Sequence, residues 1–119
     1  MKFKNSELLL INDKLSKADS TMLPVRACYA IIKNKRAIAT ALEPYWETHD
    51  AIVAKYANGK TSLSAEEDPV NFQKALNDIT ELNREEVRVN IRTLSIADMG
   101  NENISLELMN VIDFMIKED

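Results

Sequence analysis

One uninterrupted helical pattern between Pro24 and Gly59 constrains the fold of this chain more than any other feature. Proline suits the first position of a helix, because its missing N–H costs nothing there, and Asn58-Gly59 is a good helix stop. Between them, apolar side chains recur every three or four residues on one heptad seam that Lys35 and His49 interrupt: Cys28, Ile31, Ile38, Leu42, Tyr45, Ile52 and Tyr56. The pattern predicts one helix of about 34 residues, on the order of 50 Å long.

Pro44 predicts a bend within this helix. A proline inside a helix removes the hydrogen bond to the carbonyl of residue 40 and clashes with that turn, which costs roughly 3 kcal/mol unless the helix bends. Tyr45 is expected to pack at the bend, whereas Trp46 is expected at the periphery. Two roles remain open for Trp46, which are packing at the core edge and anchoring a protein partner from an exposed position.

A second, shorter helix is predicted over residues 69–84. Asp68-Pro69 pairs a capping residue with a proline at the first helical position, and Phe72, Leu76 and Ile79 continue at helical spacing. The stretch "NGKTSLSAEEDPV" (residues 58–70) is the clearest loop in the sequence. A loop of roughly ten residues lets this helix fold back antiparallel on the second half of the long helix.

The remaining elements are two short strands and two terminal helices. Residues 87–92 alternate, with Val87, Val89 and Ile91 on one face, and the only other strand candidate is Met1–Lys4, so the two are paired into a small ribbon. Helices are predicted over about residues 6–18, with Asn5 or Ser6 as the cap, and from about Ser105 to the C-terminus. The sequence therefore predicts a mainly α (α+β) fold in a single domain, residues 1–119.

Composition limits the classes of protein that fit. The chain has 119 residues, two glycines and one cysteine, which leaves no glycine-rich phosphate loop, dinucleotide fingerprint or zinc knuckle, so no cofactor is expected. Its longest apolar runs, such as residues 8–11, are too short for a transmembrane helix or a signal peptide. Cys28 cannot form an internal disulfide, in agreement with a reducing compartment. We expect an intracellular protein that does not enter membranes.

The segment "LEPYWETHD" (residues 42–50) concentrates the rare residue types and is the strongest candidate for chemistry. An imidazole beside carboxylates can tune a general base or hold a metal. However, a catalytic group normally needs a nucleophile or a second acid–base partner, and a structural zinc site needs four ligands. The only His, His49, and the only Cys, Cys28, are too far apart on one helix to meet. We therefore expect no catalytic residue and no metal, with His49 packed near the returning helix and Glu43, Glu47 and Asp50 in water.

The charge is unevenly distributed along the chain. Residues 1–60 carry ten Lys or Arg against six Asp or Glu, a balance of +4, and residues 61–119 carry five against thirteen, a balance of −8. A net charge of −4 argues against direct nucleic-acid binding, which favours a basic domain. The two halves are expected to pack with complementary potentials, and a polar binding surface is the alternative.

Four surfaces are candidates for partner binding besides Trp46. The outward face of the ribbon would carry Lys2, Lys4, Arg88 and Arg92, either to bind an acidic partner or to prevent edge-to-edge aggregation. Lys33–Arg36 ("KNKR") could grip phosphate or an acidic protein, or be a solvated helix face. The C-terminal helix, with Leu108 and Met115, is apolar nearly all round and is assigned either to the core or to a homo- or hetero-oligomer contact. Seven carboxylates form a candidate acidic surface: Glu66, Glu67, Asp68, Asp78, Glu81, Glu85 and Glu86.

Several stretches, in order along nearly the whole chain, resemble a family of small proteins encoded by phages and prophages of Gram-positive bacteria and catalogued as a domain of unknown function. They are "MKFKNSELL", "LPVRACYAIIKNKRAI", "LEPYWETHDAIVAKYANG", "NFQKALNDITELNREEVRVNIRTL" and "DFMIKED". The resemblance implies a viral protein made in the cytoplasm of the bacterial host, with virion association as a further option, and it brings no catalytic residues. Two roles fit: an accessory or assembly factor that binds phage structural proteins, or an inhibitor of a host defence protein whose acidic surface mimics nucleic acid.

Overall fold

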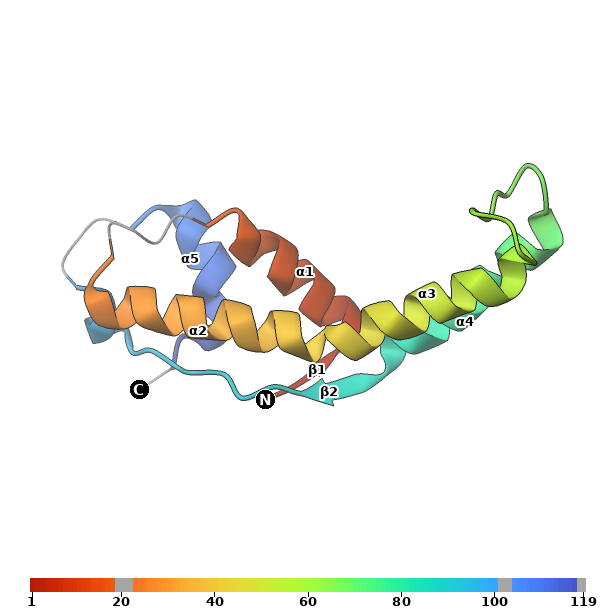
Figure 1. Cartoon of the computed structure of the whole chain (residues 1–119). Coiled ribbons are helices and arrows are strands. Elements are labelled where there is room, and N and C mark those ends of the chain that lie inside the picture. Colours follow the sequence, from red (N-terminus) through yellow and green to blue (C-terminus); the bar gives the residue numbers. More distant parts are fainter. Residues whose placement is uncertain (19–22, 101–103, 118–119) are drawn as a thin grey trace.

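The computed structural model describes residues 1–18, 23–100 and 104–117 of the chain, and it is mainly helical, as the sequence predicts (Figure 1). The molecule is elongated, with Cα extents of 56 × 24 × 18 Å. A body contains the N-terminal and C-terminal parts of the chain, and an arm of two helices projects from it. No helix among these residues is both long enough and apolar enough to cross a membrane.

The predicted long helix exists as two helices in nearly continuous order, α2 (Val25–Ala41) and α3 (Glu43–Ala57). Pro24 is the residue just before α2, with an extended backbone, so the helix begins one residue later than predicted. At the other end Asn58 adopts the left-handed conformation with φ 52°, and Gly59 follows with φ 83°. The helix stop therefore lies where the sequence places it.

The bend lies at Leu42, two residues before the proline that causes it. Pro44 is the second residue of α3 and has no N–H to offer the carbonyl of Thr40, so the strain falls on the turn that precedes it. The Leu42 N–H is shared between the carbonyls of Ile38 at 3.0 Å and Ala39 at 3.2 Å. Regular bonding resumes with Trp46 N–H donating to the Leu42 carbonyl at 3.1 Å. The bend directs the second half of the long helix away from the body (Figure 1).

The arm is the predicted antiparallel hairpin of α3 with α4 (Pro69–Arg84). Asp68 caps α4 as predicted, because its carboxylate accepts hydrogen bonds from Asn71 N at 3.1 Å and Asn71 Nδ2 at 3.0 Å. Between the helices, the Tyr56 hydroxyl donates to Asp78 at 2.8 Å. Ala57 and Ala75 are buried, and such small side chains let two helices approach closely.

The predicted ribbon pairs β1 (Lys2–Lys4) with β2 (Glu86–Arg88) in antiparallel register, Phe3 opposite Val87. It is shorter than the alternating pattern over residues 87–92 suggests. Beyond β2, residues 89–94 (the extended segment) run beside α2 without helical structure. The predicted alternation of buried and exposed side chains is confirmed, since Val89 is buried whereas Asn90 and Arg92 are exposed.

The side-chain amide of a buried residue on α2 bonds the backbone of the extended segment, as a neighbouring strand would. Asn34, on α2, is only 1% exposed. Its Oδ1 accepts from Arg92 N at 2.8 Å and its Nδ2 donates to Arg92 O at 2.9 Å. These two bonds satisfy the backbone of Arg92 as a neighbouring strand would, so the segment needs no third strand.

The N-terminal helix, α1 (Asn5–Ser16), begins where the ribbon ends. The prediction that the side chain of Asn5 or Ser6 caps this helix is wrong: Lys4 is the cap position, and Glu7 accepts from Lys4 N at 3.1 Å. Asn5 instead donates from Nδ2 to Leu82 O at 2.9 Å, while its backbone N–H donates to Glu85 O at 3.0 Å. Asn5 thus joins the start of α1 to the end of α4.

The C-terminal helix, α5 (Leu106–Ile112), is shorter than predicted, although Ser105 caps it and accepts from Leu108 N at 3.1 Å. A single 3₁₀ turn, η2 (Asp113–Met115), follows. The chain then turns back to the extended segment, where Leu94 N donates to Met115 O at 2.9 Å. Pairing with Leu94 ends the helix before its apolar pattern does.

The core lies in the body, where α1 and α5 cover one side of α2 and the extended segment covers the other (Figure 1). Its largest fully buried apolar side chains come from all of these elements and from η1 (Ile96–Met99): Leu8, Leu15, Ile31, Ile38, Leu42, Leu94, Met99, Ile112 and Met115. The arm contributes no side chain to this list. The body therefore folds around a core, and the arm is a single layer of two helices.

Asp98 ties η1 to the start of α2. Its carboxylate accepts from Ser95 N at 3.0 Å and from Arg26 Nη1 at 3.2 Å. Hydrogen bonds from the backbone and side chain of Ser95, followed by the charge and hydrogen bond of Arg26, hold the pKa of Asp98 below its ordinary value.

Because the pKa of Asp98 is lowered, we expect this carboxylate to contribute to the loss of folding stability at acid pH. Because the folded pKa lies below the unfolded one, the stabilisation is present above the ordinary carboxyl pKa and is lost as pH falls through the folded value. Asp98→Asn should lower the free energy of unfolding at pH 7 more than at pH 3, as measured by urea titration. The exposed Asp113→Asn serves as the control, and an equal loss at both pH values for Asp98→Asn would contradict the assignment.

Candidate functional site

An aromatic cluster lies at the base of the arm, just after the bend. The rings of Tyr45 and Trp46 meet edge to face with centroids 5.0 Å apart, and Trp46 meets His49 with centroids 5.5 Å apart. Tyr45 is buried, as predicted, and burial raises the pKa of its hydroxyl. Trp46 is 48% exposed. Neighbouring rings thus fix the orientation of a large side chain that still faces solvent.

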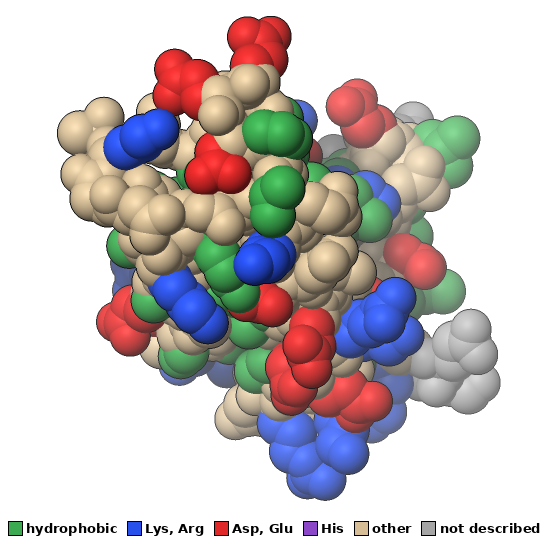
Figure 2. All heavy atoms as spheres, turned by 90° about the vertical axis from the view of Figure 1, so that its right-hand side faces the viewer, with side chains coloured by type: hydrophobic (Ala, Val, Ile, Leu, Met, Phe, Trp, Pro, Cys, Tyr) green, Lys and Arg blue, Asp and Glu red, His purple; other side chains and the backbone are tan. Residues whose placement is uncertain are grey.

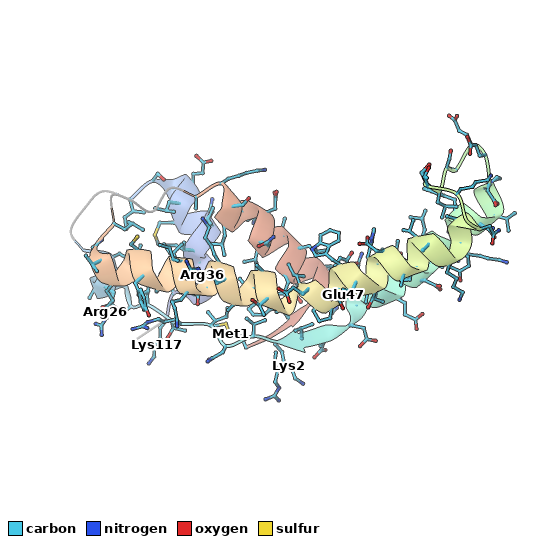
Figure 3. All side chains as sticks on the ribbon, viewed as in Figure 1. Met1, Lys2, Arg26, Arg36, Glu47 and Lys117 are labelled. Carbon is cyan, nitrogen blue, oxygen red and sulfur yellow. The ribbon has the colours of Figure 1, made fainter. Side chains whose placement is uncertain are left out.

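The polar residues of the same stretch face water or each other. His49 is partly exposed, and its Nδ1 lies 3.3 Å from Oδ1 of the adjacent Asp50. Glu43, Glu47 and Asp50 are exposed, as predicted, and Figure 3 marks Glu47 on α3 just after the bend. In the parts of the chain that the structure describes, no three His, Cys, Asp or Glu side chains gather into a group that could hold a metal ion.

The arm keeps much of its apolar surface in water. Val70 and Leu76 on α4 are exposed, as Trp46 is on α3, and the side chains between the two helices are only half-buried: Ile52, Val53, Phe72 and Ile79. A pair of helices covers its apolar seam from within and has no third element to close the flanks. Figure 2, which looks at the molecule from the tip of the arm, shows hydrophobic side chains interspersed with charged ones.

The C-terminal residues predicted for a partner contact are divided between core and surface. Met115 is 0% exposed, so it belongs to the core, and its assignment to partner binding is corrected. It points into the body because η2 turns it toward α2, where its Sδ lies 3.4 Å from Asn34 Nδ2. Leu108 is half-buried against the same core, and Leu106 is the exposed apolar residue of α5.

The basic residues predicted on the ribbon lie in two places. Lys2 stands opposite Arg88 in the register, so their side chains share the outward face of the ribbon, and Lys4 shares it too. Lys2 lies 3.7 Å from Glu86, and Figure 3 shows it extending away from the helices. Arg92 is not part of the ribbon, because it belongs to the extended segment and lies over the ring of Tyr29, 5.0 Å from its centroid.

The seven predicted acidic residues do not form one patch. Three of them make contacts within the fold: Asp68 caps α4, Asp78 accepts from Tyr56, and Glu86 pairs with Lys2. The remaining four are exposed: Glu66, Glu67, Glu81 and Glu85. Glu66 and Glu67 precede α4 and Glu85 follows it, so the length of this helix, about 24 Å for 16 residues, separates them.

Sequence reasoning missed Asn34 as a structural residue because it treated "KNKR" only as a charged run. A signal was available: Ala27, Ala30, Asn34 and Ile38 follow one another at steps of three and four, and all four are buried. The buried stripe of α2 is therefore rotated toward these small residues relative to the heptad seam. Counting alanine as apolar would have placed Asn34 in the core.

No protein-family model matches the chain, and no curated protein and no solved structure shows significant similarity to it. The resemblance to the phage family therefore stays a prediction.

Proposed function

We propose that the protein is a non-enzymatic protein-interaction module encoded by a phage or prophage, which acts in the cytoplasm of the bacterial host or on the virion. In this role it is an accessory or assembly factor that binds phage structural proteins. The observation that supports the proposal best is the projecting arm with Trp46 exposed at its base. The viral origin is supported by the family resemblance of the sequence.

Trp46 suits an anchor because its geometry is fixed before binding. Its ring contacts the rings of Tyr45 and His49, at centroid distances of 5.0 and 5.5 Å. A side chain that is already ordered loses little entropy when it enters a pocket. Tryptophan is also enriched among the few residues that dominate binding energies at protein interfaces.

The shape of the arm suits insertion between the surfaces of a partner. A helix with a half-exposed apolar flank can enter a hydrophobic groove on another protein. The arm offers two such helices, α3 and α4, at the end of a molecule that is 56 Å long. We propose that it reaches away from the body to join neighbouring structural proteins, and a homo-oligomer through the same arm is the second option.

Inhibition of a host defence protein through an acidic, nucleic-acid-like surface is the alternative proposal. It has less support because mimicry needs carboxylates grouped like phosphates. Here Asp68, Asp78 and Glu86 already bind groups within the fold, and the others lie at opposite ends of α4. The assembly role is therefore preferred.

Trp46→Ala should reduce recovery of the partner by more than about tenfold, because a hot-spot tryptophan contributes on the order of 2 kcal/mol or more. The measurement is affinity capture of tagged protein from phage-producing cells, with quantitative mass spectrometry of phage capsid and tail proteins. Val25→Ala is the matched control, since Val25 is an exposed apolar residue at the start of α2 on the body. Trp46→Phe retains an aromatic ring and should keep part of the recovery.

Two results would contradict this proposal. Equal losses for Trp46→Ala and Val25→Ala would show that the arm is not the docking element. Recovery of a host nuclease or another defence enzyme, without any capsid or tail protein, would refute the assembly role and favour the alternative. Thermal unfolding of each variant checks that a lost contact with Tyr45 has not unfolded the chain.

A further inference from the structure

A basic groove lies between α2 and the extended segment, on the body. It is an open hollow of about 720 Å³. Three cationic side chains line it, Lys33 and Arg36 from α2 and Arg92 from the extended segment, with the polar side chains of Thr40 and Asn90 beside them. None of the described residues that line it is Asp or Glu.

The cations of the groove are not neutralised by nearby carboxylates, and contacts with neighbouring groups position two of them, Lys33 and Arg92. Within the described part of the chain, Lys33, Arg36 and Arg92 form no ion pair with a carboxylate. Arg92 lies 5.0 Å and Lys33 5.8 Å from the centroid of the Tyr29 ring. The backbone of Arg92 is fixed by both hydrogen bonds to Asn34. Three charges of one sign are therefore presented together, with no carboxylate partner among the described residues.

The basic surface continues beyond the groove. Arg92 also lines a second hollow of about 310 Å³, to which Arg26 and Lys117 contribute. The acidic residue that lines this hollow is Asp98, which already pairs with Arg26 at 3.2 Å. Figure 3 shows Arg26 and Lys117 near the start of α2 and Arg36 farther along it. Ten residues of helix separate Arg26 from Arg36, about 15 Å, so the cations form a track and not a single focus.

We infer that this track, defined by Arg26, Lys33, Arg36, Arg92 and Lys117, binds the phosphodiester backbone of a single-stranded nucleic acid. A row of Lys and Arg side chains follows a chain of phosphates, and neutralising each phosphate releases counterions. Tyr29, which is 51% exposed, places an aromatic ring among the cations, and aromatic rings interleaved with cations are typical of single-strand binding surfaces. An acidic peptide would use the cations but would have no need of the ring.

The negative charge of the whole chain does not oppose this assignment, because no Asp or Glu is among the described residues that line the groove, and Asp98 in the second hollow is paired with Arg26. The carboxylates of residues 66–86 belong to α4, the loop before it and the start of β2. Interactions between exposed charges are largely screened beyond about 10 Å at moderate salt. The charged side chains that line the groove are Lys33, Arg36 and Arg92, so these are the charges nearest to a phosphate bound there. The whole-chain balance does not reveal this local grouping.

The test is fluorescence anisotropy with labelled 20-nucleotide single-stranded DNA and RNA and the full-length protein. Three to five contacts predict a slope of log affinity against log salt between about −2 and −3.5, and the double variant Lys33→Glu/Arg36→Glu should bind more than about tenfold more weakly. The control double variant, Lys60→Glu/Lys74→Glu, makes the same change of charge on the arm and should stay within about twofold of the parent. Arg92→Gln keeps the backbone bonds to Asn34 and should also weaken binding.

Three outcomes would overturn the inference. Equal weakening in the groove and arm double variants would mean that only total charge matters. Displacement of the oligonucleotide by polyglutamate at the same concentration of charge would identify an acidic peptide as the ligand. Displacement by millimolar inorganic phosphate would identify a single-oxyanion site. Circular dichroism of the exposed-site variants confirms that any loss of binding comes from a folded protein.

Discussion

Asn34→Leu should destabilise the protein by about 2–4 kcal/mol, because it leaves two backbone groups of Arg92 without a partner in a partly buried position. The amide of Asn34 now accepts from Arg92 N at 2.8 Å and donates to Arg92 O at 2.9 Å. Leucine has a similar volume and can replace neither bond. The measurement is the free energy of unfolding from urea titration at pH 7.

The matched control is Asn110→Leu, since Asn110 is an exposed residue on α5. A surface substitution of this kind should change stability by less than about 0.5 kcal/mol. If Asn34→Leu were as stable as the parent, the extended segment would not depend on this amide. The placement of Arg92 beside Tyr29 would then lack its main support.

Met115→Ala should cost about 2–5 kcal/mol, because it removes a large side chain from a packed core and leaves a cavity. Met115 is 0% exposed, and Leu106, on the neighbouring helix, is 78% exposed. Leu106→Ala should therefore change the free energy of unfolding by less than about 0.5 kcal/mol. Urea titration of both variants beside the parent measures the difference.

Met115→Ala also distinguishes two roles for Met115, which are packing in the core and contact between subunits of an oligomer. Light scattering should give the same molecular mass for the parent and for Met115→Ala under native conditions. A Met115→Ala protein that kept its stability and changed its molecular mass would contradict the burial of this side chain. It would restore the interpretation of Met115 as a contact between subunits.

The elements that follow from local pattern were predictable. The long helix, its stop at Asn58-Gly59 and the start of the second helix at Asp68-Pro69 depend on turn and cap chemistry within a few residues. The bend also followed from one residue, although it lies at Leu42 and not at Pro44 itself, because the proline distorts the turn before it. Antiparallel pairing of the two helices followed from the short loop between them.

The elements that depend on distant partners were less predictable. The alternation over residues 87–92 indicates a strand, but the pairing with the first strand extends only to Val89, which exchanges hydrogen bonds with Met1, and farther along Asn34 satisfies the backbone of Arg92. The last helix ends at Ile112, despite further apolar residues, because Met115 pairs with Leu94. Neither Asn34 nor Leu94 is recognisable as a partner from the sequence around the segment that it contacts.

The exposure of single candidate binding residues was predictable from the sequence, but which of them share a surface was not. Trp46 was expected at the periphery and is exposed. The row of Lys2, Lys4, Arg88 and Arg92 assumed one long ribbon, and Arg92 instead joins Lys33 and Arg36 in the groove beside α2. Which charges share a surface depends on the path of the extended segment, and that path is fixed by a buried amide that the charge pattern does not reveal.

The most direct test of the docking account places a photo-cross-linking amino acid at position 46 and, in a matched protein, at the exposed position 106 on α5. Both proteins are irradiated in phage-producing cells, and the adducts are identified by mass spectrometry. The account predicts adducts with a phage capsid or tail protein from position 46 and none of them from position 106. Equal adducts from the two positions, or adducts with a host defence enzyme alone, would contradict it.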